Sequence, residues 1–234
     1  MRVPLIRNYD SVSLKEVMKT STKWNIGIAA TLFVCLAVIV TVFVLRPSAS
    51  ERADAEGLTA AAAANSHRLS VAAEGQPVFV EFLDFECEVC GAAYPAIEQL
   101  REEYAGRVSF VARYFPIPSH KNSMNAAIAV EAAAQQGQFE AMYKKMFDTQ
   151  TQWGEQQDSK ASVFRGYAEE LGLDMVAFDD AVADPATKSR VQSDFSQGTA
   201  LGVQGTPTFF LDDEKLDVGS VDEIRTLLDQ ALTS

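Results

Sequence analysis

Apolar residues follow three different patterns along this chain of 234 residues. Residues 26–45 form one uniformly apolar run that carries no charge. Residues 77–85 and 108–115 are short runs rich in Val and Phe, which are typical of strands. From about residue 121 to residue 202, apolar residues recur every three to four positions, as they do in amphipathic helices. The pattern predicts an apolar N-terminal segment and an α/β domain that is interrupted by helices.

The uncharged run predicts a transmembrane helix over residues 24–46. Its twenty residues span roughly 30 Å in a helix, which is the hydrocarbon thickness of a bilayer. Five basic residues lie within residues 1–23, so we expect this tail to be cytoplasmic and the helix to be a retained signal anchor. A cleaved signal peptide is the alternative, because the small residues at 48–50 and 53–55 suit a signal peptidase.

Charge and composition change beyond this segment. Residues 47–65 lack large apolar residues at any regular period and include five consecutive alanines, so we interpret residues 47–70 as an Ala-rich linker. Residues 71–234 then form one domain. The whole chain has 20 basic and 32 acidic residues, a net charge of −12, which argues against a nucleic-acid partner.

Within this domain, the predicted order of elements is typical of a parallel sheet with an insertion. A helix follows the strand at 77–85 and ends near Gly106, and the strand at 108–115 comes next. Helical patterns alone then occupy residues 119–202, which predicts an inserted helical subdomain. A strand at 208–211 and a final helix, opened by a capping box at Ser220, complete the domain.

The candidate chemistry lies where the first strand meets its helix. Cys87 and Cys90 are three residues apart in the first helical turn, close enough to form a disulfide. Free backbone N–H groups at a helix N-terminus stabilise a thiolate, which predicts Cys87 as the nucleophile and Cys90 as the resolving thiol. A structural disulfide or half of a metal site is the alternative. The histidines, His67 and His120, lack ligand spacing to this pair, so we expect no metal.

These features resemble the DsbA-like branch of the thioredoxin fold family. The resemblance covers roughly residues 75–233 and is carried by residues 82–87 at the cysteines, by Tyr114-Phe-Pro116 and by residues 201–210 with a late Thr-Pro. It implies a thioredoxin fold with an inserted all-helical subdomain, following the predicted transmembrane helix. It also implies a thiol:disulfide oxidoreductase that needs no cofactor.

The resemblance assigns roles to three further residues. Thr206 and Pro207 would form a cis peptide whose backbone binds an extended substrate chain. An ordinary proline at the start of a strand is the alternative. Glu81 would be a buried acid that relays protons to Cys90, although a solvent-facing strand residue fits the same pattern. Asp84 is a weaker candidate, which we interpret as part of the turn after the strand, and for His120 we expect packing at the start of a helix.

Acidic residues beside the first cysteine bear on the direction of electron flow. Glu86 and Glu88 add negative charge near Cys87, so we expect them to raise its pKa and to make the couple less oxidising. A pKa shift of one or two units changes the reduction potential by only tens of millivolts. Such a change can blur oxidase against reductase or isomerase, but the reaction remains thiol–disulfide exchange.

The sequence thus predicts an oxidoreductase at the bacterial cytoplasmic membrane, single-pass, with its catalytic domain outside. It would form disulfides in exported proteins. The resemblance implies re-oxidation by a quinone-linked membrane partner of the DsbB or vitamin K epoxide reductase type. One alternative is a reductase or isomerase with the same fold. Another is a non-catalytic module that binds copper or senses redox state through the two cysteines.

Overall fold

The computed structural model describes residues 59–233 of the chain. The tail predicted at 1–23, the transmembrane helix predicted at 24–46 and the first half of the predicted linker lie outside these residues. None of the helices within residues 59–233 is long and apolar enough to cross a membrane.

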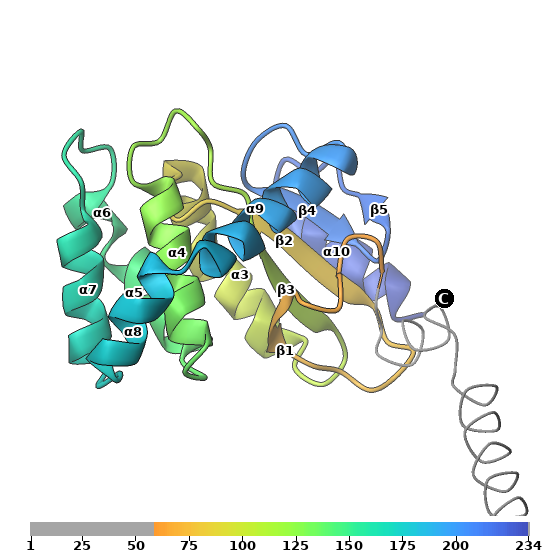
Figure 1. The fold of residues 1–234 in the computed structure, drawn as a ribbon. Coiled ribbons are helices and arrows are strands. Elements are labelled where there is room, and N and C mark those ends of the chain that lie inside the picture. The colour runs from red at the N-terminus through yellow and green to blue at the C-terminus, as the bar shows by residue number, and fades with distance from the viewer. Residues whose placement is uncertain (1–58, 234) are drawn as a thin grey trace, which may run out of the picture. The chain divides into compact units, whose positions relative to one another are not determined.

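A mixed sheet of five strands in the order β1-β3-β2-β4-β5 forms the centre of the described domain (Figure 1). β2 and β3 are parallel, whereas β1 pairs antiparallel with β3 and β4 pairs antiparallel with both β2 and β5. The parallel pair is buried along its whole length, which explains its nearly continuous apolar sequence. The strands are β1 (His67–Ser70), β2 (Val78–Leu83), β3 (Ser109–Tyr114), β4 (Thr208–Leu211) and β5 (Glu214–Lys215).

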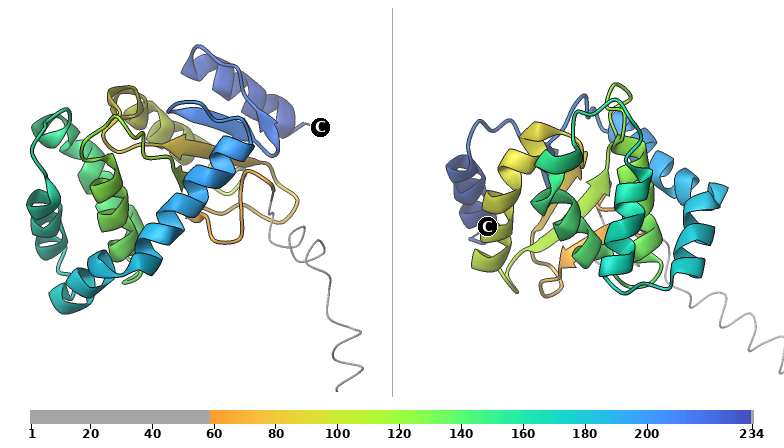
Figure 2. Two further views of the ribbon diagram at one scale, coloured as in Figure 1. Left: turned by 45° about the horizontal axis from the view of Figure 1, so that its top comes forward. Right: turned by 90° about the vertical axis from the view of Figure 1, so that its left-hand side faces the viewer.

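Alternate residues of β2 point to opposite faces of the sheet. Phe79 packs with Leu100 of α3 (Glu88–Glu103) and Leu228 of α10 (Val221–Ala231), so these two helices cover one face. Val80 and Phe82 belong to a separate cluster on the other face, against which Phe195 of α9 packs. Figure 2 shows α9 running from the other helices across to this second face.

Six helices lie between β3 and β4, in the segment for which the sequence predicts an insertion. We call them the helical insertion. They are α4 (Ser123–Ala134), α5 (Phe139–Asp148), α6 (Gln150–Trp153), α7 (Ala161–Glu170), α8 (Met175–Ala183) and α9 (Pro185–Ala200). The alanines of α4 are almost all buried, because α5, α7, α8 and α9 all pack against this helix. The predicted α/β fold with an inserted helical subdomain is thus confirmed.

Residues 59–70 differ from the sequence interpretation, which places them in a linker. Ala61 and Ala62 are fully buried, and the Ala61 carbonyl accepts a hydrogen bond of 2.9 Å from buried Arg113. His67–Ser70 forms the edge strand β1. Their small side chains allow Ala61 and Ala62 to lie close against the domain.

Candidate active site

Cys87 is the N-cap residue of α3, at the end of a short connection from β2. Its backbone is extended, and its N–H donates to the Asp84 carbonyl at 3.1 Å. No side chain caps this helix, so the N–H groups of its first turn remain free for the Cys87 sulfur. Cys87 and Cys90 are both free thiols, with 6% and 0% of their surfaces exposed.

Hydrogen bonding lowers the pKa of Cys87 to about 5. The largest cause is a hydrogen bond from the Cys90 side chain, and partial burial opposes it. The backbone N–H groups of Cys90 and Val89 lower this pKa further by hydrogen bonding to the thiolate. Cys87 is thus a thiolate at neutral pH.

Cys90 has the opposite character. Burial, with the hydrogen bond to Cys87 and the charge of Glu81, raises its pKa well above the ordinary value. The two sulfurs therefore differ in both access and charge: the outer one is an anion and the inner one is a neutral thiol. This is the asymmetry that thiol–disulfide exchange requires of a nucleophile and a resolving thiol.

The net shift of the Cys87 pKa is a lowering, and the upward effect predicted for Glu86 and Glu88 stays a prediction. The Glu86 carboxylate is buried and accepts a hydrogen bond of 2.5 Å from the backbone N–H of Asn122. Glu88 is exposed to water, which screens its charge. Hydrogen bonds to the sulfur, with that from the Cys90 side chain first, determine the direction of the net shift.

Glu81 lies inside the domain, on the face of β2 that α3 covers. Its side chain follows the same alternation as Phe79, and only 5% of the residue is exposed. Burial raises the pKa of Glu81 to about 8, with smaller effects from the charges of Glu98 and Cys87. Glu81 is therefore largely protonated at neutral pH.

Asp84 and His120 form a pair that sequence reasoning did not connect. The Nδ1 atom of His120 lies 2.7 Å from an Asp84 carboxylate oxygen, and the two residues are 36 positions apart. Asp84 also accepts hydrogen bonds from the backbone N–H groups of Glu86 and Ile117, which fits the predicted turn role. His120 interacts electrostatically with Cys87 and lines a cavity of about 520 Å³. In the sequence, a lone histidine after a Pro-rich segment does not indicate that His120 pairs with Asp84.

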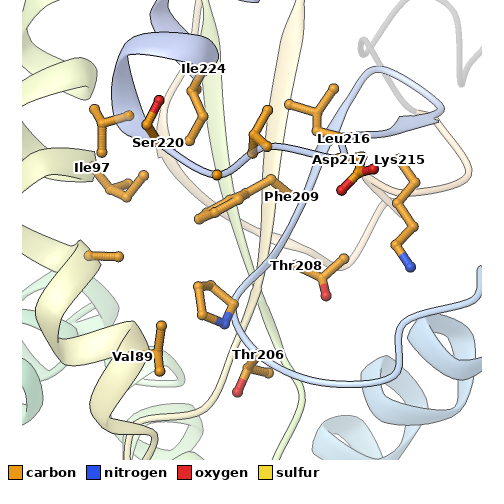
Figure 3. Close-up of a pocket in the computed structure, with 15 residues that line it drawn as sticks. Val89, Ile97, Thr206, Thr208, Phe209, Lys215, Leu216, Asp217, Ser220 and Ile224 are labelled. Atoms are coloured by element: carbon orange, nitrogen blue, oxygen red, sulfur yellow. The ribbon is translucent and has the colours of Figure 1, made fainter.

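Thr206 and Pro207 lie next to the reactive sulfur. Their peptide bond is cis, the geometry expected from the sequence, and the Thr206 carbonyl lies 3.3 Å from the Cys87 sulfur. A cavity of about 390 Å³ opens beside them. In Figure 3 its walls come from α3 on one side and from the segment around β4 on the other, with these labelled residues: Val89, Ile97, Thr206, Thr208 and Phe209.

Within residues 59–233, no group of three or more His, Cys, Asp or Glu side chains is arranged to hold a metal ion. The site consists of two cysteines, a buried acid and the adjacent cavity of about 390 Å³. A comparison with protein families agrees with this composition, because the model of a family described as thioredoxin matches residues 72–230, more than half of the chain.

The chain belongs to the thioredoxin family. Among solved structures, a thioredoxin-like oxidoreductase from Silicibacter pomeroyi matches with a TM-score of 0.63 and 24% identity, over 78% of this chain and 98% of that one. Alpha-DsbA1 from Wolbachia pipientis matches with a TM-score of 0.61 and 18% identity, over 73% and 92% of the two chains. BdbD from Bacillus subtilis matches with a TM-score of 0.61 and 18% identity, over 70% of this chain and 92% of that one. These three structures share the fold of this thioredoxin-family chain.

Curated relatives of this thioredoxin-family chain are larger proteins. A segment of 141 residues is 36% identical to part of the Na(+)/H(+) antiporter NhaA 1 of Mycobacterium sp. (strain KMS), covering 59% of this chain. The antiporter NhaA 3 of Salinispora tropica is 35% identical over 139 residues. The chain spans only about a fifth of the length of these relatives, 22% and 20%.

Proposed function

We propose that this chain is a membrane-anchored, extracytoplasmic thiol:disulfide oxidoreductase that forms disulfides in exported proteins. The observation that carries the proposal is the contrast between a thiolate at Cys87 and a buried neutral thiol at Cys90. Membership of the thioredoxin family and the DsbA-like fold support the same reaction class.

In the oxidising direction, a substrate thiolate attacks the Cys87 sulfur of the Cys87–Cys90 disulfide. The sulfur–sulfur bond breaks, and its electron pair leaves on Cys90. The substrate's second thiolate then attacks the substrate sulfur of the mixed disulfide, and Cys87 departs as a thiolate. The substrate gains a disulfide, and the enzyme is reduced by two electrons. A leaving thiolate that is stable at neutral pH speeds this last step.

Glu81 is our candidate for the proton that Cys90 needs. A thiolate released inside the domain is costly because burial disfavours its charge. Glu81 is buried on the face of the sheet next to α3 and has a pKa of about 8, so it holds a proton at neutral pH that it can give to Cys90. The charge left on Glu81 raises the pKa of Cys90 and keeps the received proton in place.

The low pKa of Cys87 favours the oxidase over the reductase. Anything that stabilises the reduced thiolate makes the disulfide a stronger oxidant, and a pKa of about 5 lies well below that of an ordinary thiol. The carbonyl of Thr206, the cis Pro207 and the adjacent cavity would hold an extended substrate chain across this sulfur.

The anchor and the redox partner belong to the same proposal. The uncharged run within residues 24–46 would hold the domain at the outer face of the bacterial cytoplasmic membrane, with residues 1–23 inside. A quinone-linked oxidase of the DsbB or vitamin K epoxide reductase type would then remove the two electrons. Tethering would raise the effective concentration of the domain near that partner and near emerging chains.

The deciding experiment combines a reduction potential with turnover, both measured on the full chain in detergent with its metal content determined. We expect a potential nearer to the roughly −120 mV of strong oxidants than to the roughly −270 mV of thioredoxin. We also expect multiple turnovers of disulfide formation in a reduced protein substrate, with oxidised glutathione as oxidant. A potential near that of thioredoxin would assign a reductase, and stoichiometric copper without turnover would assign a binding module.

A further inference from the structure

Gln150 connects the helical insertion to the reactive cysteine. It is the first residue of α6, and only 7% of its surface is exposed. Its amide nitrogen donates hydrogen bonds of 2.8 Å to two backbone carbonyls, those of Phe85 and Cys87. Both amide hydrogens are thereby used on the connection that leads from β2 into α3.

Gly91 leaves the space that this amide occupies. A Cβ atom built on Gly91 would lie 1.9 Å from Oε1 of Gln150 and 2.7 Å from its amide carbon, distances that no real contact reaches. The Gly91 N–H also donates to the Cys87 carbonyl at 3.0 Å. Glycine in a helix interior costs stability relative to alanine, so its presence here needs a local reason.

We propose that Gln150 is a positioning residue for Cys87, and that Gly91 lacks a side chain because one would displace the Gln150 amide. The inference rests on the proposed function only in taking Cys87 as the nucleophile. It assigns the helical insertion a part in the reaction, through one side chain that touches the backbone and not the sulfur.

The physical reason is the polarity of the two carbonyls. Among the described residues, Gln150 is the only donor to the Phe85 carbonyl, so its removal would leave a buried acceptor without a partner. The connection would then have to move to reach water or another donor. Because the thiolate of Cys87 depends on N–H groups in the first turn of α3, such a movement would weaken the hydrogen bonds that stabilise its charge.

The first test is a titration of the Cys87 thiolate by its ultraviolet absorbance in the reduced full chain. Gln150→Leu removes both donors. Gln150→Glu replaces a donor with an acceptor that faces two carbonyls. We expect about fivefold less thiolate than in the unsubstituted chain at a pH just below its midpoint, with the larger loss for Gln150→Glu. Gln152→Leu, at an exposed position of the same helix, is the matched control and should change nothing.

The second test is a double-mutant cycle, which stays informative if leucine does not fit. Gly91→Ala alone should lower both the thiolate fraction and the stability, because the new methyl group meets the amide. Gln150→Ala removes every atom that this methyl group would approach within 3.0 Å. In that background Gly91→Ala should therefore cost nothing further, so the two substitutions should couple strongly.

These outcomes separate the inference from the proposed function. Cys90, Glu81 and His120 are titratable groups that interact with Cys87, and Gln150→Leu changes none of them. Gln150→Glu adds a carboxylate whose own charge disfavours the thiolate, so the leucine variant decides the test. A folded Gln150→Leu chain with an unchanged thiolate midpoint overturns the positioning role. Additive effects in the cycle overturn the explanation of Gly91. The titration needs no substrate, so it holds whether or not the chain turns over.

Discussion

The sheet with α3 and α10 contains the candidate reacting groups, whereas the interior of the helical insertion is mainly apolar. The sheet region supplies both sulfurs, buried Glu81 and the Thr206–Pro207 segment. Much of the insertion's interior is apolar, with Trp153, Phe164 and Phe178 nearly fully buried. The comparison teaches that the reacting groups lie in one region, while the other holds that region in place through a few polar contacts.

One of these contacts is a buried ion pair. Arg113 of β3 donates to Asp194 of α9 at 2.6 and 3.0 Å, and neither side chain is exposed. Gly198 of the same helix lies so close to Phe82 and Phe115 that an added Cβ would be within 3.0 Å of both rings. The helical insertion is therefore packed closely against the sheet region along α9.

The largest effect should come from the reacting groups themselves. We expect Cys87→Ser to abolish turnover, and Cys90→Ser to accumulate mixed disulfides, because the Cys87 thiolate still attacks disulfides while the resolving Cys90 thiol is missing. Thiol trapping and non-reducing gels check both outcomes. In the reduced chain, alkylation of Cys87 should rise through about pH 5. An active Cys87→Ser chain would contradict the assignment of the nucleophile.

A second substitution breaks the contact between the two regions. Arg113→Met leaves Asp194 buried with only Arg190 as a cationic partner, and should lower the free energy of unfolding by about 3 kcal/mol or more. Chemical denaturation measures this loss. The same chain, below its denaturation midpoint, should keep the thiolate midpoint of Cys87. A shifted midpoint would show that this ion pair also shapes the site, and the division between regions would fail. Arg113→Met with Asp194→Leu, which removes both charges, should recover part of the stability.

A third and smaller effect concerns proton transfer inside the sheet region. Glu81→Gln should slow the step in which Cys90 takes its proton by about 10- to 100-fold, and should remove the pH dependence near 8 from that step. Stopped-flow reduction of the oxidised chain across pH measures both. An unchanged profile would assign the proton to another donor.

The raised pKa of Glu81 also predicts how the stability of the fold depends on pH. Folding raises the pKa of Glu81 from 4.5 to about 8, so folding favours its protonated form. The corresponding stability is fully present below about pH 4.5 and is lost as pH rises towards and through about 8. Glu81→Gln should flatten this decline in denaturation curves collected across that range, whereas Glu88→Gln, at an exposed position, should retain it.

The sequence predicted those helices and strands whose apolar period and end signals lie within the element itself. Strands β2 and β3, the helix with the two cysteines and the capped final helix all lie where the sequence places them, because each combines an apolar period with a clear end signal. The Ser220 hydroxyl caps α10 as expected, accepting from the Glu223 N–H at 3.3 Å. The sequence could indicate the position of the two cysteines at the start of α3, because their spacing and the end of the preceding strand are local signals.

Features that depend on distant residues gave no such signal. Strand β1 has few apolar residues, and it forms because β3 offers an unpaired edge. Gln150 lies 63 positions from the Cys87 carbonyl that it contacts, in a polar stretch typical of a surface. The burial of Glu86 gave no signal either, because its carboxylate accepts a hydrogen bond from the backbone N–H of Asn122, which is 36 positions away.

The two edge strands of the sheet, β1 and β5, bear on whether the proposed unfolded substrates could cause aggregation. An exposed strand edge invites an extended polypeptide to pair with it and to begin aggregation. Here one edge strand, β1, has four residues with an irregular register, and the other, β5, has two, Glu214 and Lys215, both charged and exposed. Neither offers a long template. Under the proposed function, an incoming chain would find no persistent pairing at these edges, and the reversible contact beside Cys87 would be the favoured place to bind.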